Sequence, residues 1–209
     1  MKKKEDYEKG SRTIKYMFVW ILLTIILGLN PYNRVAWFLD FIIIFGFAMF
    51  FILIRKKFEF SNVSLILITI LIFLNLYGYN WGFGNVPLFL GLDTFGVERN
   101  PYDKFMHFLF GVLAFYPLTE ILSKKIKVNK NAMLFICFSV IMGLGAIYEI
   151  IEYILAQLLS PEINKVYLAT LGDEWDTQKD MFVMGIGAVL YISARYIYNL
   201  KIKFKKIRN

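Results

Sequence analysis

The chain has 209 residues, of which 58% are hydrophobic and 18% aromatic, whereas soluble domains are about 45–50% apolar. The excess falls in blocks of about 17–23 residues, the length that crosses about 30 Å of hydrocarbon as a helix. This pattern excludes an ordinary soluble domain and predicts an all-α, polytopic membrane protein. The formal net charge of +8 is compatible with a nucleic-acid partner, but its distribution along the chain has a simpler explanation.

Six apolar stretches are long enough to be transmembrane helices, and we expect them to form one domain over residues 1–209. They lie at about residues 14–29, 35–54, 61–79, 104–122, 132–159 and 176–200. No small-residue cleavage site follows the first stretch, which predicts an uncleaved anchor. Pro117 is expected to kink the fourth helix, because it cannot donate to the carbonyl of Leu113. Residues 81–92 are apolar but too short to span, so they are expected to lie at the interface or re-enter.

Lysine and arginine residues are concentrated on one side of the predicted membrane. Nineteen of them fall in four segments, and five fall elsewhere; the four segments are residues 1–15, 55–57, 124–130 and 195–208. Because short cytoplasmic loops carry the excess of Lys and Arg, both termini are predicted to be cytoplasmic. The basic tail then serves as a topology signal that faces anionic lipid, and no nucleic-acid partner is expected.

Acidic residues have the opposite distribution. Eleven of the sixteen map outside the membrane or to the outer halves of the predicted helices, namely Asp40, Asp93, Glu98, Asp103, Glu149, Glu152, Glu162, Asp173, Glu174, Asp176 and Asp180. This excess of negative charge would attract cations to the outer side. Glu120 instead lies at the inner end of the fourth helix, where we expect it to reach the interface or pair with Lys124.

Three predicted helices bring ionisable residues to the same depth near the outer side. The residues are paired at a spacing of three or four, which puts each pair on one helical face: Asp103 with His107, Glu149 with Glu152, and Asp176 with Asp180. Asp173 would share the last face if that helix starts early, and Asp40 is a further candidate. Gly111 continues the face of His107 and would permit close helix approach. Carboxylates at such a depth are expected to face the bundle interior and have partners.

One imidazole among carboxylates is a plausible ligand set for a divalent metal. The ion would be Zn, Mn or Fe if His107 binds, and Mg or Ca if oxygen ligands dominate. The candidates for metal ligands or acid–base groups are His107, Glu149, Glu152, Asp176 and Asp180, with Asp103 and Asp173 as further metal candidates. The same residues are equally compatible with a proton relay. Without a metal the acids would repel one another, and some would be protonated at neutral pH.

Each candidate also has a simpler interpretation. Asp176 or Thr177 would serve as the N-cap of the sixth helix, with Thr177 and Asp180 forming a capping box. Asp103 would equally cap the fourth helix, and His107 would be a hydrogen-bonded core histidine. Glu149 and Glu152 are the hardest to explain structurally, because nothing in the pattern places them at a helix end.

Two sequence patterns resemble known families. The residues from Asp103 to Phe108 resemble the D-K-x-x-H-F signature of VanZ-like membrane proteins. A longer set resembles the YjdF-like family of bacterial inner-membrane proteins, and it comprises Tyr102-Asp103, His107-Phe108, Gly111, Glu149-x-x-Glu152 and the block GDEWDTQKDM at 172–181. This second resemblance covers about residues 101–187. It implies a multi-pass helical protein of the bacterial cytoplasmic membrane whose activity is unassigned. VanZ-like relatives are associated with glycopeptide resistance, which implies a link to the cell envelope; resistance itself is not transferred, because this chain departs from the VanZ pattern after the fourth helix.

Three functions fit these observations. The first is an enzyme with an outward-facing, possibly metal-binding site that acts on a lipid-linked or cell-envelope substrate. The second is a cation- or proton-coupled transporter, although the fifth helix offers few polar residues further inward. The third is a non-catalytic membrane scaffold whose acids cap helices and join them by hydrogen bonds.

Overall fold

The computed structural model describes residues 2–54, 58–89, 100–158 and 173–208, and every regular element among them is helical. The elements are α1 (Lys2–Gly28), α2 (Arg34–Ile54), α3 (Asn62–Trp81), the short 3-10 helices η1 (Phe83–Asn85) and η2 (Pro87–Phe89), α4 (Tyr102–Leu113), α5 (Phe115–Lys125), α6 (Lys130–Leu158) and α8 (Asp176–Arg208). The predicted all-α class is therefore confirmed. The segment after α3, which was expected to lie at the interface or re-enter, forms η1 and η2 in its described part.

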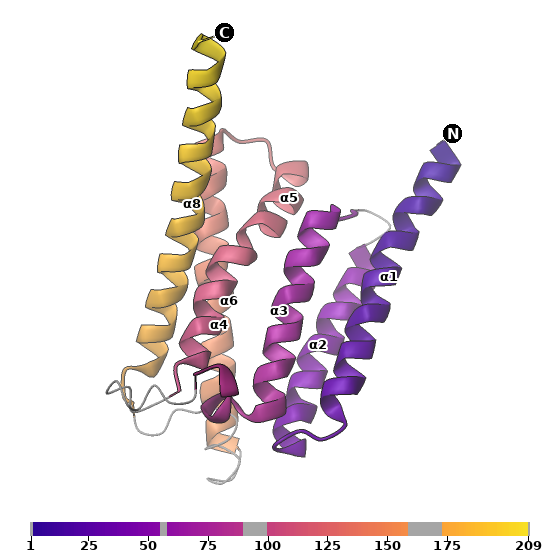
Figure 1. Ribbon diagram of the computed structural model, residues 1–209, viewed down its shortest axis with the longest axis vertical. Coiled ribbons are helices and arrows are strands. Elements are labelled where there is room, and N and C mark those ends of the chain that lie inside the picture. The colour runs from indigo at the N-terminus through magenta and orange to yellow at the C-terminus, as the bar shows by residue number, and fades with distance from the viewer. Residues whose placement is uncertain (1, 55–57, 90–99, 159–172, 209) are drawn as a thin grey trace.

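The long helices lie side by side along the long axis of the molecule (Figure 1). The start of α1 and the end of α8 lie at one end, and the starts of α4 and α8 lie at the other. We call these the basic end and the site end. The charged segments of α1, α5 and α8 thus gather at a single end, as the positive-inside interpretation requires. Six crossings and cytoplasmic termini remain predictions.

Four helical segments in the described part of the chain are long and apolar enough to cross a membrane: Asn62–Trp81, Tyr102–Lys125, Lys130–Leu155 and Asp176–Asn199. Their outer surfaces carry large apolar side chains that the bundle does not cover, such as Phe135 and Phe182, which are 71% and 68% exposed. Water would not favour such surfaces, whereas hydrocarbon accommodates them. The chain is therefore a multi-pass membrane protein.

The fourth predicted span is divided into α4 and α5 at Ala114. The amide of Ala114 donates to Phe110 and that of Leu118 donates to Ala114, so the helical pattern resumes beyond Pro117. The chain changes direction between α4 and α5, so the predicted kink is present (Figure 1). It directs α5 toward α3 at the basic end, while α4 stays against α8 (Figure 1).

Glu120 of α5 makes a different contact from the one expected. Its carboxylate accepts the Ser61 amide at 2.9 Å and the Ser61 hydroxyl at 3.0 Å, together with the Ser64 hydroxyl. Ser61 is the N-cap of α3 and accepts the Ser64 amide at 3.3 Å, so Glu120 supports this cap from α5 and places its negative charge at the N-terminus of α3, where it is favourable. The expected pairing with Lys124 is wrong, because the ammonium of Lys124 lies over the Phe58 ring at 4.3 Å.

Two glycines set the distance between α4 and α8. A Cβ atom on Gly111 would overlap the backbone of Met184, and one on Gly187 would overlap the carbonyl oxygen of Phe108. Backbone atoms cannot move aside as a flexible side chain can. The two helices therefore approach as closely as they do only because both positions lack a side chain.

We predict that Gly111→Ala and Gly187→Ala each lower the free energy of unfolding by about 1–3 kcal/mol or more, the usual cost of overpacking a tight contact. The measurement is thermal unfolding of the purified protein in detergent. Gly143→Ala is the matched control, because nothing lies within 4 Å of a Cβ atom there. Equal unfolding temperatures for Gly187→Ala and Gly143→Ala would contradict the proposed contact.

Candidate functional site

A short polar residue lies before each of the helices α4 and α8 and accepts a backbone amide. Asn100 accepts the Tyr102 amide at 3.1 Å, and Asp173 accepts the Trp175 amide at 3.1 Å. Both are turns in which a short side chain binds the backbone two residues on. Asn100 thus binds the first amide of α4, and Asp173 binds the amide of Trp175, the residue before α8.

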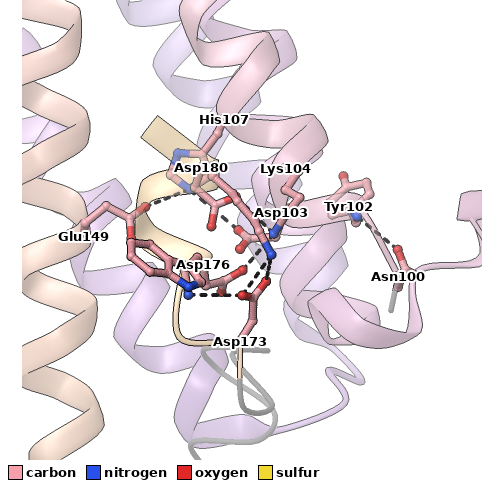
Figure 2. Close-up of polar contacts among 11 residues, drawn as sticks. Asn100, Tyr102, Asp103, Lys104, His107, Glu149, Asp173, Asp176 and Asp180 are labelled. Carbon is pink, nitrogen blue, oxygen red and sulfur yellow. Dashed lines mark hydrogen bonds and ion pairs between the residues drawn. The ribbon is translucent and has the colours of Figure 1, made fainter. Parts of the chain in front are cut away.

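The capping interpretations of the sequence are accordingly wrong. Asp103 is the second residue of α4 and Asp176 the first of α8, so neither precedes its helix. Thr177 and Asp180 lie further inside α8, where a capping box cannot form. The sequence did not reveal this because it does not define the residue at which a helix starts. The carboxylates of Asp103 and Asp180 instead lie on the facing sides of α4 and α8 (Figure 2).

Asp103, His107 and Asp180 form the centre of the site. Each offers one ligand atom, and these atoms all lie within 4.8 Å of one another. The Nε2 atom of His107 is 3.8 Å from Asp103 Oδ1 and 3.2 Å from Glu149 Oε1. Figure 2 shows Glu149 reaching His107 from α6, so three helices contribute to one cluster.

The cluster is buried although all its members are ionisable. The exposed fractions are 2% for Asp180, 6% for Glu149 and Asp176, 7% for Asp103 and 8% for His107. Two carboxylate oxygens, Glu149 Oε1 and Asp180 Oδ1, are buried without a hydrogen bond in the described part of the chain. An unsatisfied buried polar atom is costly, about 1–3 kcal/mol and more when charged. The nearest cationic or imidazole nitrogens to these two oxygens are His107 Nε2, 3.2 Å from Glu149 Oε1, and Lys104 Nζ, 3.5 Å from Asp180 Oδ1.

Lys104 is a member of the site that the sequence analysis missed. Its Nζ atom lies 2.7 Å from Asp176 Oδ1 and 3.5 Å from Asp180 Oδ1. In the sequence, Lys104 was only a basic residue on the predicted outer side, where acidic residues predominate. Its position between Asp103 and His107 could have indicated that it belongs to the site. One ammonium and one imidazole face four buried carboxyl groups, so negative charge still predominates.

Tyr148 was missed as well. Its ring packs edge-on against His107 with 5.8 Å between centroids, and its hydroxyl lies 3.3 Å from that of Tyr79. It precedes Glu149 on α6, so it holds the imidazole from the side where Glu149 reaches it. An aromatic residue in an apolar helix carries no sequence signal for such a role.

The remaining predicted residues lie outside the central triad or outside the described side chains. Glu152 is partly buried one turn beyond Glu149, close enough to Asp103 and Glu149 for electrostatic interaction. Asp173 is paired with Lys179, whose Nζ atom lies 2.9 and 2.7 Å from its two oxygens. The side chain of Asp40 lies outside the described residues.

The fold and the site define a multi-pass helical membrane protein with a buried histidine–carboxylate cluster at the site end of the bundle. The family described as "Predicted membrane protein (DUF2238)" matches residues 13–201, and the chain belongs to this family. It is similar to the inner membrane protein YjdF of Escherichia coli (strain K12), with 27% identity over 187 residues that cover 86% of this chain and 89% of that protein. The YjdF-like resemblance is thereby confirmed over most of the chain, while the VanZ-like signature remains a prediction. No solved structure matches.

The ion pair between Asp173 and Lys179 provides a test of the geometry at the start of α8. The hydrogen bond from Lys179 and then that from the Trp175 amide lower the pKa of Asp173. A lowered folded-state pKa stabilises the fold above the unfolded pKa of about 3.9, and this contribution is lost as the pH falls through the folded-state value. We predict that Lys179→Met raises the pKa of Asp173, as followed by carbon NMR of aspartate carboxyls. The signal is assigned with Asp173→Asn, and Lys125→Met at the basic end is the control. An unchanged pKa in Lys179→Met would contradict the pairing.

Proposed function

We propose that Asp103, His107 and Asp180 bind one divalent metal ion and that this centre acts on a lipid-linked or cell-envelope substrate. The observation that supports the proposal is the mutual distance of three buried ligand atoms, none more than 4.8 Å from another. Ligands about 2.1 Å from a tetrahedral ion lie about 3.4 Å apart, so side-chain adjustments of about 1–1.5 Å would complete the geometry. One imidazole in the set favours Zn, Mn or Fe, and a larger share of oxygen ligands would favour Mg or Ca.

The charge of the cluster supports a cation. Asp103, Glu149, Asp176 and Asp180 are buried together, and Lys104 compensates only part of their combined charge. A divalent ion would balance this charge and occupy the acceptor position at Asp180 Oδ1 that has no hydrogen bond. A scaffold role in which these acids cap helices explains the cluster less well, because Asp103 and Asp180 lie inside α4 and α8 and precede neither helix.

The residues around the triad have roles suited to hydrolysis. A bound divalent ion lowers the pKa of a coordinated water to about 7 or polarises a substrate oxygen. Glu149 Oε1, 3.2 Å from His107, is placed to accept a proton, and Glu152, one turn beyond Glu149, extends the acidic wall. Lys104 would orient an anionic group of the substrate while pairing with Asp176. The members of the cluster on α4 and α8 lie within the first two turns of these helices, and we expect this end to face water and lipid headgroups.

Metal content tests this proposal. We expect the purified wild type to hold about one equivalent of Zn, Mn or Fe by plasma mass spectrometry. Asp180→Asn and His107→Ala should each weaken metal affinity more than about 100-fold, because even the loss of an outer hydrogen-bonding partner costs about 10–100-fold. Glu174→Gln is the matched control, since this exposed acid lies two residues before Asp176 and outside the cluster. A wild type that neither retains nor is thermally stabilised by a divalent ion would contradict the metal site.

A cation- or proton-coupled transporter is the second candidate, because the same acids would attract a cation. The described core inward of the site is against it: Phe115, Met133, Cys137, Ile141, Met184 and Ala188 form one buried cluster between α5, α6 and α8. A path across the membrane needs polar groups or water, which this packing does not offer.

Ion flux separates the two candidates. For the enzyme we expect proteoliposomes that contain the wild type to show no more proton or divalent-cation flux than empty vesicles, and Glu149→Gln to change nothing. Flux that depends on the wild-type chain and is abolished by Glu149→Gln would favour the transporter instead. Glu174→Gln again serves as the control.

A further inference from the structure

A polar cavity lies at the basic end of the bundle, at the opposite end from the proposed metal site. Its volume is about 360 Å³, within the range of about 300–1,000 Å³ typical of ligand pockets. It is lined by Arg12 of α1, by Glu120 and Lys124 of α5, and by the segment before α3, Phe58, Glu59, Phe60 and Ser61. Three separate parts of the chain thus meet around it.

The cavity wall carries two cations, Arg12 and Lys124, and two carboxylates, Glu59 and Glu120. The Glu120 carboxylate is already bound by the Ser61 amide and by the hydroxyls of Ser61 and Ser64, so the N-terminus of α3 compensates it. The Lys124 ammonium is 4.3 Å from the centre of the Phe58 ring and 3.5 Å from the carbonyl oxygen of Glu59, which are both uncharged groups. Arg12 is the second cation in the wall, and Glu59 contributes the remaining carboxylate.

The cavity is also amphipathic. Phe58 and Phe60 are buried and pack edge to face with 4.7 Å between their centroids, which makes one wall apolar. Beyond Arg12, the same face of α1 carries Val19 and Ile26, seven and fourteen residues further on, which are 43% and 52% exposed. A ligand with a charged head and apolar chains would place its head between Arg12 and Lys124 and its chains along α1.

We propose that this cavity binds a phosphate group through Arg12 and Lys124. A guanidinium binds phosphate through paired hydrogen bonds, and an ammonium contributes a point charge. An anionic phospholipid headgroup and free inorganic phosphate both carry this chemistry. The apolar wall and the exposed face of α1 point to the lipid, because free phosphate would use neither. The headgroup would then join α1 to α5 at the basic end.

The test is native mass spectrometry of the full chain, delipidated in detergent and titrated with phosphatidylglycerol. The variant is Arg12→Gln/Lys124→Gln, and the control Lys125→Gln/Lys127→Gln removes two exposed charges from the same end. Each lysine or arginine near a membrane surface contributes about 1 kcal/mol, or about fivefold in affinity. We therefore expect binding to weaken about 25-fold in the cavity variant and less than about twofold in the control. Equal affinities for the cavity variant and the wild type, or equal losses in variant and control, would overturn the proposal.

A second arm identifies the source of the phosphate. Inorganic phosphate at millimolar concentration is expected not to displace phosphatidylglycerol, and phosphatidylcholine is expected to bind more weakly because its head is neutral overall. Displacement by inorganic phosphate would overturn the headgroup assignment in favour of free phosphate. If the double variant does not fold, Arg12→Gln alone should lose about fivefold, while the charge-conserving Arg12→Lys should bind within about twofold of wild type. Equal binding by these two single variants would overturn the role of Arg12.

Discussion

The close approach of α4 and α8 at Gly111 and Gly187 is the constraint on which the site depends. His107 lies one helical turn before Gly111, and Asp180 lies two turns before Gly187. Once the backbones touch at the glycines, these side chains must lie near one another because each turn of a helix adds only about 5.4 Å. The glycine contact thus determines the distances within the cluster, although neither glycine belongs to it.

Burying several carboxylates near such a contact is unfavourable unless something compensates their charge. Lys104 provides part of the compensation from α4 itself, and Glu149 arrives from α6 to complete the wall around His107. The excess of buried carboxyl groups over the single ammonium of Lys104 is the physical reason for proposing a bound cation. Asp173 has a structural role instead. It lies outside the cluster, and its exposed ion pair with Lys179 stabilises the start of α8.

The two ends of the bundle use the same residue types in different ways. At the site end, acids from three helices converge, and short polar residues before α4 and α8 bind backbone amides at the helix starts. At the basic end, a single acid, Glu120, supports the cap of α3 from a neighbouring helix, and the nearby cations border an amphipathic cavity. Pro117 contributes to both ends, because the break it accompanies lets α4 stay against α8 while α5 turns toward α3 (Figure 1).

The sequence by itself determined the helical membrane class, the kink at Pro117, the YjdF-like family and the three helices that carry the candidate residues. These follow from local properties, namely apolar length, residue spacing and the backbone chemistry of proline. Only the tertiary structure decided that Asp103 and Asp180 face His107, that Lys104 joins them and that Glu120 supports the cap of α3. Each of these depends on where one helix begins and on which face it presents to a neighbour. Both are set by contacts between residues far apart in the chain, above all by the two glycines at which α4 and α8 meet.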